Sequence, residues 1–332
     1  MAINLNFHGF HSILVDVDAL GQRHPALDAA LNLAIHCHAK VKAVDVIWDI
    51  PPNARSFVTP RMEQEIVENH HEHLVRLACW RQRPVPVETA ILRGAPGVAL
   101  VQEVLRNGHD LLVRAHGRDL PNEPPVFGPI DLHLLRTCPC PVWLVGPRES
   151  FAPAPHVIAA IDSSATHPEE QALNRQIIER ALMLREARGG TVTVLHAWQA
   201  YGEYLLQPRM TPQVFSDFLQ HAERSAHDAT AALVESLDER ARDVRVDIVK
   251  GDPADVIPAI AFETHADTIV MGSMGRNGLA GLFMGNTAER VLRHWQGSVF
   301  VVKPLGFVSP VVLDHQTEDS AQPRVTAAST RA

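Results

Sequence analysis

The feature that most constrains the fold is an internal duplication. Residues Arg93–Pro147 align on Lys250–Pro304 without a gap, and the segment that begins at Ile13 matches the one that begins at Val157. The offset is roughly 150 residues, whereas solenoid repeats are about 20 to 50 residues long. The sequence therefore predicts a duplicated domain. The matched positions include Gly94 with Gly251, Pro96 with Pro253, Asp110 with Asp267, Gly128 with Gly285, and Leu135-Arg136 with Leu292-Arg293.

Each half alternates short β-branched apolar runs with longer segments of helical period. This pattern predicts an α/β fold in which a parallel sheet has helices on both faces. We expect two tandem doubly wound, Rossmann-like domains, each with five strands in the order 3-2-1-4-5. The expected strands are 12–17, 41–47, 85–91, 110–114 and 142–146 in the first half, and 156–161, 191–196, 244–249, 267–271 and 298–302 in the second.

The domain boundaries follow from the repeat and from composition. We place the first domain at residues 1–150 and the second at 151–306. Residues 307–332 are rich in Ser, Thr, Gln, Ala and charge toward their end, which predicts a disordered tail. The stretch from Thr211 to Arg242 has a helical period with Phe215 and Phe218 on its apolar side, and we expect that side to pack on its own sheet.

Charge and cysteine content exclude several classes of protein. The net charge is −8, from 30 basic and 38 acidic residues, and no long basic run is present, which disfavours nucleic acid as a partner. The first twenty residues contain no Lys or Arg and no long apolar core, so we expect neither a signal peptide nor membrane insertion. The chain has four cysteines, too few for a disulfide-stapled secreted scaffold, and we expect a cytoplasmic protein with reduced thiols.

The most informative segment follows the fourth expected strand of the second half. It reads Gly272-x2-Gly275-x9-Gly285 and continues with Asn286-Thr287, where Asn286 is expected to cap a helix. Glycines allow backbone N–H groups to converge, and a helix N-terminus adds positive potential, so the segment suggests an anion cradle. The glycines alone would equally suit a tight turn. The segment has no P-loop lysine, and it is not the Gly-x-Gly-x-x-Gly of dinucleotide-binding domains.

The expected topology places this segment opposite a carboxylate. Asp162 ends the first strand of the second half and Gly272 ends the fourth, and these strands flank the switch point where open α/β sheets bind ligands. A carboxylate there can accept a hydrogen bond from a ribose hydroxyl or a base amine. The sequence therefore predicts a nucleotide-type crevice in the second half.

These residues resemble a known family. The spacing Gly272-x2-Gly275-x9-Gly285 resembles the ATP-binding signature of universal stress proteins, and the strand that ends at Asp162 resembles their first strand. The resemblance covers almost the whole chain as two tandem domains. The segments 109–112, 133–139 and 285–289 resemble in particular the tandem E-type members of bacteria.

The resemblance implies a cytoplasmic stress-survival factor with an adenine nucleotide alpha hydrolase-like fold and at most weak ATP hydrolysis. E-type members are linked to resistance against DNA-damaging agents. It also implies that the domains pair within a chain or in a homodimer. ATP or another adenine nucleotide would bind in the second domain only, with Asp162 on the adenosine side and Gly272, Gly275, Arg276, Gly285, Asn286 and Thr287 around the phosphates and ribose. Asn286 departs from the family, whose ATP-binding members have Ser or Thr there, and this weakens the inference.

The first half lacks the corresponding chemistry. Ala115 and Arg118 stand at the positions of Gly272 and Gly275, and Gly128 is followed by Pro129, which has no N–H to offer a phosphate. We therefore predict that the first domain binds no nucleoside triphosphate and serves as a packing partner or carries another ligand.

Histidine and cysteine clusters suggest further chemistry only weakly. His36-Cys37-His38 and His70-His71-x-His73 have no complementary set of ligands, so we expect surface histidines and no structural metal. Cys138-Pro139-Cys140 allows either a redox pair or two packed thiols, and the intervening proline favours packed thiols.

Two other functions stay open. A lipophilic metabolite could bind in the crevice or along the apolar side of the 211–242 helix, near the aromatic residues Tyr201 and Tyr204. A slow ATPase would use the same nucleotide crevice with a metal ion on the phosphates.

Overall fold

The computed structural model describes residues 9–80, 85–117, 127–146, 155–237, 239–273 and 284–313. Its first domain contains β1 (Ser12–Asp16), α1 (Pro25–Cys37), β2 (Lys40–Ile47), α2 (Pro60–Trp80), β3 (Val87–Arg93), α3 (Pro96–Asn107), β4 (Leu111–Ala115), α4 (Pro129–Thr137) and β5 (Val142–Val145). The second contains β6 (His156–Ile161), α5 (Pro168–Arg188), β7 (Thr191–Trp198), α6 (Glu203–Leu206), α7 (Pro212–Glu235), β8 (Arg245–Lys250), α8 (Pro253–Glu263), β9 (Thr268–Gly272), α9 (Asn286–His294) and β10 (Ser298–Val302).

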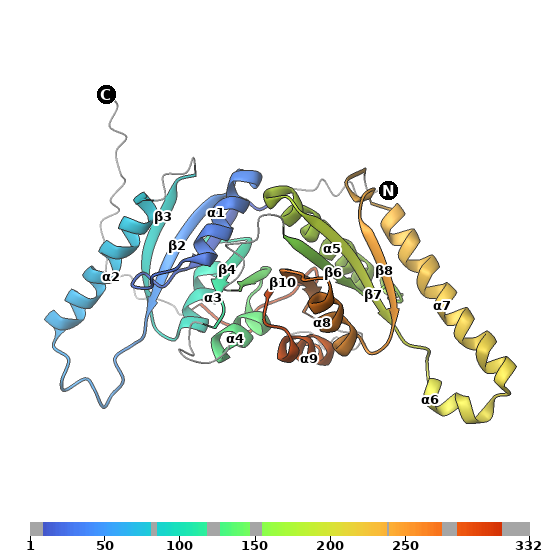
Figure 1. Ribbon diagram of the computed structural model, residues 1–332. Coiled ribbons are helices and arrows are strands. Elements are labelled where there is room, and N and C mark those ends of the chain that lie inside the picture. The colour runs from blue at the N-terminus through green and yellow to red at the C-terminus, as the bar shows by residue number, and fades with distance from the viewer. Residues whose placement is uncertain are drawn as a thin grey trace.

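The predicted fold class is confirmed. Each expected strand is present within a few residues of its expected bounds, and the strands of each half follow the order 3-2-1-4-5. The two halves are joined more closely than expected, because they form one ten-stranded sheet in the order β3-β2-β1-β4-β5-β10-β9-β6-β7-β8 (Figure 1).

The seam of this sheet is the pairing of β5 with β10. These strands are antiparallel, with Trp143 opposite Phe300, while the other strand pairs of the sheet are parallel. Both aromatic side chains are fully buried, and their ring centroids lie 6.1 Å apart. The pairing removes one exposed edge strand from each half, where an apolar edge would otherwise invite aggregation.

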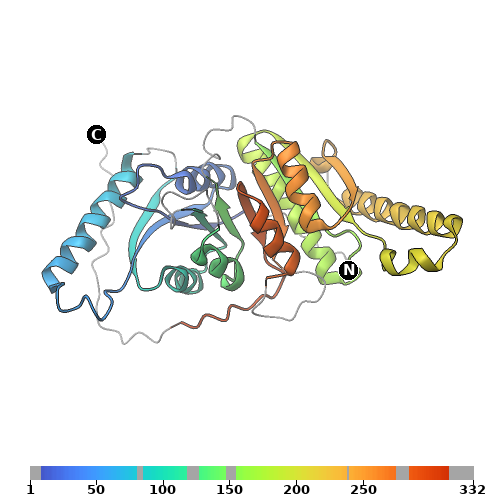
Figure 2. The same ribbon diagram turned by 60° about the horizontal axis from the view of Figure 1, so that its bottom comes forward.

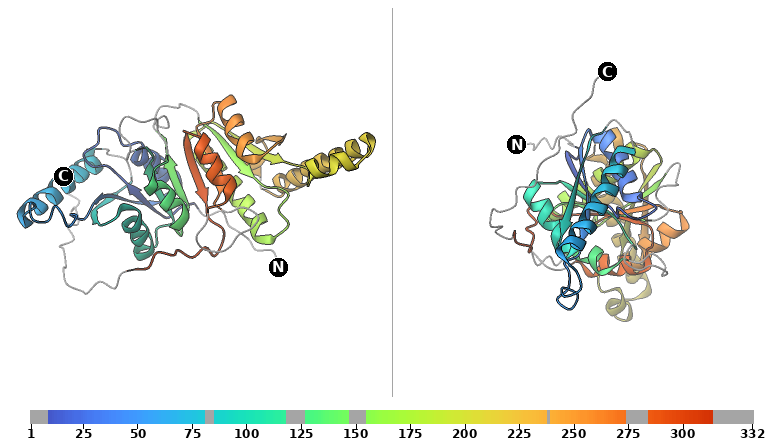
Figure 3. Two further views of the ribbon diagram at one scale, coloured as in Figure 1. Left: turned by 90° about the horizontal axis from the view of Figure 1, so that it is seen from below. Right: turned by 90° about the vertical axis from the view of Figure 1, so that its left-hand side faces the viewer.

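Helices cover both faces of the joined sheet (Figure 1; Figure 3, left). The core on one face is built by α1, α2, α5 and α7, and the core on the other by α3, α4, α8 and α9. Helices of the two domains also meet across the seam. On the first face the Cys37 thiol lies 3.7 Å from the Met183 sulfur, and on the second Arg136 donates to Glu289 at 2.7 Å.

The antiparallel seam has a consequence for the carboxyl edges. The parallel strands of the first domain run opposite to those of the second. Ligands of open α/β sheets bind beyond the carboxyl ends of the strands. Any ligand sites of the two domains would therefore open on opposite edges of the sheet.

The chain returns to the first domain after β10. Residues 303–313, brown to red in Figure 2, run from the second domain along the first. Ser309 donates to the carbonyl of Thr137 at 2.7 Å, and Gln102 donates to the carbonyl of Val312 at 3.0 Å. Residues 307–313, which the sequence assigns to the tail, thus contact the first domain, and residues 314–332 lie outside the described residues.

Helix α7 packs less than its periodicity suggests. Its N-cap is Thr211, whose hydroxyl accepts from the Val214 N–H, but the helix ends at Glu235 rather than near Arg242. Only Ala226 and Thr230 are buried along it, and its first half extends beyond the sheet (Figure 1). The expected packing is confirmed in part: Phe218, Leu219 and Ala222 are partly buried against Trp198 and Ala200, while most other side chains of the first half are exposed. No helix within the described ranges combines the length and the apolar character needed to cross a membrane.

His116, at the end of β4, ties the first domain to the second. Its Nε2–H donates to the carbonyl of Gly297 at 3.1 Å, and its buried Nδ1 has no partner among the described residues. Burial lowers the pKa of His116 from 6.5 to about 4, although the hydrogen bond to Gly297 opposes the shift. The ring is therefore neutral in the folded protein at neutral pH.

We predict that His116 makes folding pH-dependent. Between pH 6.5 and 4 the unfolded chain binds a proton at this ring and the folded chain does not, so stability falls as the pH falls through this window. At about 1.4 kcal/mol per pKa unit, the loss amounts to about 3 kcal/mol. Urea unfolding at pH 7 and pH 4 should show a smaller loss for His116→Gln than for the wild type. The exposed His71→Gln serves as the control, and parallel losses in all three proteins would refute the prediction.

Candidate functional site

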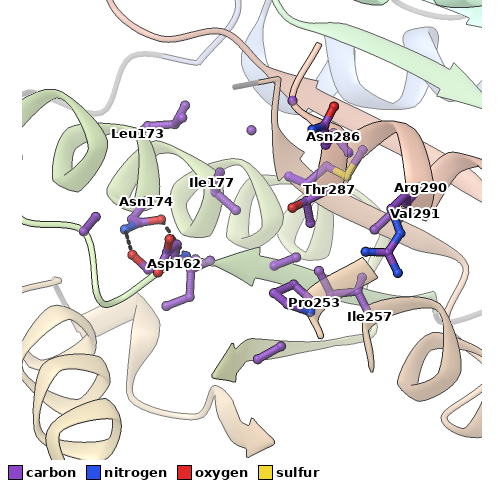
Figure 4. A pocket seen from close by; sticks show the side chains of 18 of the residues that line it. Asp162, Leu173, Asn174, Ile177, Pro253, Ile257, Asn286, Thr287, Arg290 and Val291 are labelled. Carbon is purple, nitrogen blue, oxygen red and sulfur yellow. Dashed lines mark hydrogen bonds between the residues drawn. The ribbon is translucent and has the colours of Figure 1, made fainter. Parts of the chain in front are cut away.

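A cavity of about 640 Å³ opens at the carboxyl edge of the second domain (Figure 4). Its volume lies within the usual range for sites that bind small molecules, about 300 to 1,000 Å³. Four elements supply most of its walls: β6 and the loop after it, α5, the start of α8, and the first turns of α9. The lining residues are Ala160, Ile161, Asp162, Ala165, Glu170, Leu173, Asn174, Ile177, Ala197, Gln199, Asp252, Pro253, Ile257, Met271, Gly272, Met284, Gly285, Asn286, Thr287, Ala288, Arg290 and Val291.

Asp162 stands at the end of β6, as the sequence predicts, and its backbone is held firmly. Asn174 of α5 accepts from the Asp162 N–H at 3.0 Å and donates to its carbonyl at 2.6 Å, a pair of bonds drawn in Figure 4. The Asp162 carboxylate accepts from the N–H and the hydroxyl of Ser164, at 3.2 and 2.5 Å. This arrangement fixes the direction of the carboxylate at the cavity wall. Asn174 was not predicted, because its role depends on the return of α5 over β6.

The end of the glycine-rich segment lies across the cavity from Asp162. Gly285, Asn286 and Thr287 line the cavity at the start of α9. The first N–H groups of a helix have no acceptor within the helix, so those of α9 can serve a ligand. The predicted cap is displaced by one residue: Gly285 is the N-cap, Asn286 is already helical, and Glu289 pairs with Arg136 of the first domain. The Gly285 N–H is itself occupied, because it donates to the carbonyl of Ser273 at 3.0 Å.

Gly272 has a packing role that the sequence did not reveal. It lines the cavity, but a Cβ added there would lie 2.8 Å from a methyl carbon of Leu173 on α5. The absence of a side chain therefore allows α5 to approach β9. The structure brings five of the predicted site residues to one cavity, and the other two, Gly275 and Arg276, lie outside the described residues.

Charged groups at the cavity rim were missed. Asp252 is the N-cap of α8, and it accepts from Arg290 of α9 at 2.6 Å, while Asp255 accepts from the same guanidinium at 3.1 Å. The hydrogen bond from Arg290 lowers the pKa of Asp252. An Asp before a Pro is typical of a helix N-cap, and this pattern could have predicted the role of Asp252. It could not have predicted that Arg290 of α9 is the partner of Asp252.

No metal centre is evident in the described ranges. Groups of three or more His, Cys, Asp or Glu side chains placed to hold a metal ion are absent from them. The histidine-rich part of α2 makes ordinary contacts instead: His70 lies 2.8 Å from the Asp45 carboxylate, and His73 lies 2.8 Å from the carbonyl of Asn69.

Comparison with known proteins identifies both halves. A model of the universal stress protein family matches residues 9–146 and again residues 156–303. The chain belongs to the universal stress protein family. It is 30% identical to universal stress protein E of Escherichia coli K12 over 322 residues, which cover 93% of this chain and 99% of that protein. It is 25% identical to a universal stress protein E homologue of Haemophilus influenzae over 312 residues, or 89% and 98% of the two chains.

Solved structures show the same fold. A Pseudomonas aeruginosa PAO1 protein described as functionally unknown has a TM-score of 0.65 and 22% identity, covering 90% of this chain and 94% of its own. A universal stress protein of Archaeoglobus fulgidus has a TM-score of 0.54 and 18% identity, covering 88% and 98%. Both therefore match the tandem arrangement over nearly their full length.

The first universal stress domain has charged residues where the second has its cavity. Arg114 of β4 donates to Asp16 of β1, and its Nε donates to Asp131 of α4 at 2.8 Å. All three residues are at most 2% exposed. The repeat aligns each of them with a cavity-lining residue of the second domain: Asp16 with Ala160, Arg114 with Met271, and Asp131 with Ala288.

The triad also satisfies the N-cap of α4. Asp131 accepts from the Gly128 N–H at 2.8 Å, whereas the equivalent Gly285 N–H of the second domain donates to the carbonyl of Ser273. The first domain thus fills its crevice with Asp16, Arg114 and Asp131. The sequence also predicts that this half has lost its site, but it bases this on other residues, Ala115, Arg118 and Pro129. Of these, Arg118 lies outside the described residues.

We predict that the triad acts as a unit. Arg114→Met leaves two carboxylates buried without their cation, and breaking a buried ion pair in this way costs about 3–5 kcal/mol. Replacing all three residues by their second-domain counterparts, Asp16→Ala with Arg114→Met and Asp131→Ala, removes all three charges of the triad together. Denaturant unfolding should therefore find the triple variant more stable than Arg114→Met alone. A triple variant that is less stable than the single one would contradict this account.

Proposed function

We propose that this universal stress protein binds an adenine nucleotide in its second domain. In this proposal it acts in the cytoplasm as a regulatory or protective factor in stress survival, including resistance to DNA-damaging agents. Its main role is not the catalytic hydrolysis of the nucleotide. One observation carries the proposal: an open cavity at the switch point has the Asp162 carboxylate on one wall and the N-terminus of α9 on another. This is the pairing of hydrogen-bond acceptor and anion site that a nucleoside phosphate requires.

The described residues fit such a ligand. Apolar side chains such as Ile161, Leu173 and Ile177 offer a surface for a base, and Asp162 can accept from a ribose hydroxyl or an amine. The first turn of α9 can donate to a phosphate. Asn286 contributes a backbone N–H there whatever its side chain, so the Asn in place of Ser or Thr removes a hydroxyl without removing the cradle.

Three negative groups favour a particular form of the nucleotide. Asp162, Glu170 and Asp252 line the cavity together with one described cation, Arg290, which is already paired. Added negative charge is unfavourable in such surroundings. We therefore expect AMP, or ATP with a divalent cation on its phosphates, to bind better than free ATP.

Variants of the cavity test this proposal. Labelled AMP and magnesium-ATP should bind the wild-type chain at equilibrium, and Gly285→Val and Asp162→Asn should each lower the affinity at least about tenfold, or about 1.4 kcal/mol. The Val side chain would obstruct the approach to α9, and Asn would replace the charged carboxylate by a neutral amide with one acceptor oxygen in place of two. The matched control is Asp18→Asn, the equivalent change in the first domain, which should leave affinity unchanged. Equal binding by all four proteins would contradict the proposal.

A second candidate ligand is a lipophilic metabolite, and the apolar part of the cavity wall favours it. The aromatic residues that first suggested it do not contribute: Tyr201 and Tyr204 are 92% and 86% exposed, and neither they nor α7 line the cavity. Mass spectrometry of small molecules extracted from the purified protein separates the candidates. An adenine nucleotide would dismiss the lipid, and a stoichiometric lipid would dismiss the nucleotide.

A further inference from the structure

Two thiols lie in contact at the seam between the domains, and a buried ammonium group lies near them. Cys138 follows α4, Cys140 precedes β5, and their Sγ atoms lie 3.5 Å apart within hydrogen-bond distance. Cys138 is fully buried and Cys140 is 8% exposed. Lys303 comes from the other domain, directly after β10, and its ammonium donates to the carbonyl of Leu135 at the end of α4.

Lys303 is buried without a carboxylate. Its side chain is 5% exposed, and no Asp or Glu among the described residues lies within ion-pair distance. Besides Leu135, the ammonium contacts the ring of Phe307, 4.8 Å from its centroid. A buried ammonium is costly unless a negative group accompanies it. The groups near it that can become negative are the two thiols.

The surroundings shift the pKa values of the two thiols in opposite directions. Burial acts to raise the pKa of Cys138, but the hydrogen bonds from Cys140 and the charge of Lys303 outweigh it and lower that pKa. Burial and the neighbouring sulfur raise the pKa of Cys140. Burial also lowers the pKa of Lys303, to about 8, although both sulfurs oppose the shift. Cys138 is therefore the more acidic of the two thiols.

We propose that Cys138 and Cys140 form a redox-active dithiol, a modification site at which a hydroperoxide converts the two thiols into an intrachain disulfide. Their sulfurs are already in contact, and side-chain movements of the order of 1.5 Å would bring them to the S–S distance of about 2.05 Å. The thiolate is the reactive form of cysteine, and the lowered pKa of Cys138 favours it.

The reaction balances with hydrogen peroxide as the oxidant. The Cys138 thiolate attacks one peroxide oxygen, so that an S–O bond forms, the O–O bond breaks, and the departing hydroxide takes a proton to become water. The Cys140 sulfur, losing its proton, then attacks the Cys138 sulfur; the S–S bond forms, the S–O bond breaks, and a second water leaves. Two thiols are oxidised by two electrons, and one peroxide is reduced to two waters.

Mass spectrometry of the full chain tests the site directly. Trypsin releases both cysteines in one peptide, residues 137–148, and the exposed Cys79 serves as an internal reference. After a peroxide dose that oxidises Cys79, denaturation in iodoacetamide should leave this peptide unlabelled and lighter by two hydrogen atoms. Dithiothreitol should restore two labels. A peptide that still takes two labels, or one that gains oxygen without losing the hydrogens, would overturn the proposal.

A matched pair of variants tests the part played by Lys303. Lys303→Arg keeps the positive charge and should oxidise at close to the wild-type rate. Lys303→Met should oxidise about tenfold more slowly at pH 7, because loss of the positive charge raises the pKa of Cys138 and lowers the fraction of thiolate. Equal rates in the three proteins would refute the role of Lys303. Circular dichroism establishes that the Met variant is folded, and if it is not, the wild-type peptide decides the proposal alone.

Discussion

The antiparallel pairing of β5 with β10 is the interaction on which the rest of the architecture depends. It converts two five-stranded sheets into one, buries Trp143 against Phe300, and places α1 beside α5 and α4 beside α9. Because it inverts one domain relative to the other, the two carboxyl edges lie on opposite sides. The polar groups at the carboxyl edge of each sheet must therefore find their hydrogen-bond or charge partners within their own domain.

The two domains solve this problem differently on the same backbone. The second leaves a cavity beside an open helix terminus, with small or apolar residues such as Ala160 and Ala288 on its walls. The first places Asp16 and Asp131 at those positions and neutralises them with Arg114. Duplication thus permits one copy to become a rigid packing partner while the other keeps a site.

Much of the fold follows from the sequence, because the repeat and the alternation of strand and helix periods are local signals. The convergence of Asp162, Gly272 and Gly285 follows as well, since the topology of a doubly wound sheet fixes where strand ends meet. The seam cannot be predicted in the same way, because pairing between the two halves produces no periodic pattern in the sequence. Its one signal is that two strands, Val142–Val145 and Ser298–Val302, are unusually apolar for strands at the edge of a sheet. The triad had a signal in Asp16 and Arg114, charged residues within apolar strands, but their mutual contact required the register.

Within the described residues, the second domain has a cavity where the first has the Asp16–Arg114–Asp131 triad, so a nucleotide should bind in the second domain and not in the first. Amide hydrogen exchange of the full chain, with and without saturating magnesium-ATP or AMP, tests it most directly by peptide. The account predicts that the nucleotide slows exchange in residues 160–165 and 284–291 and leaves residues 14–18 and 127–132 of the first domain unchanged. Slower exchange in both sets of peptides, or in the first domain alone, would contradict it.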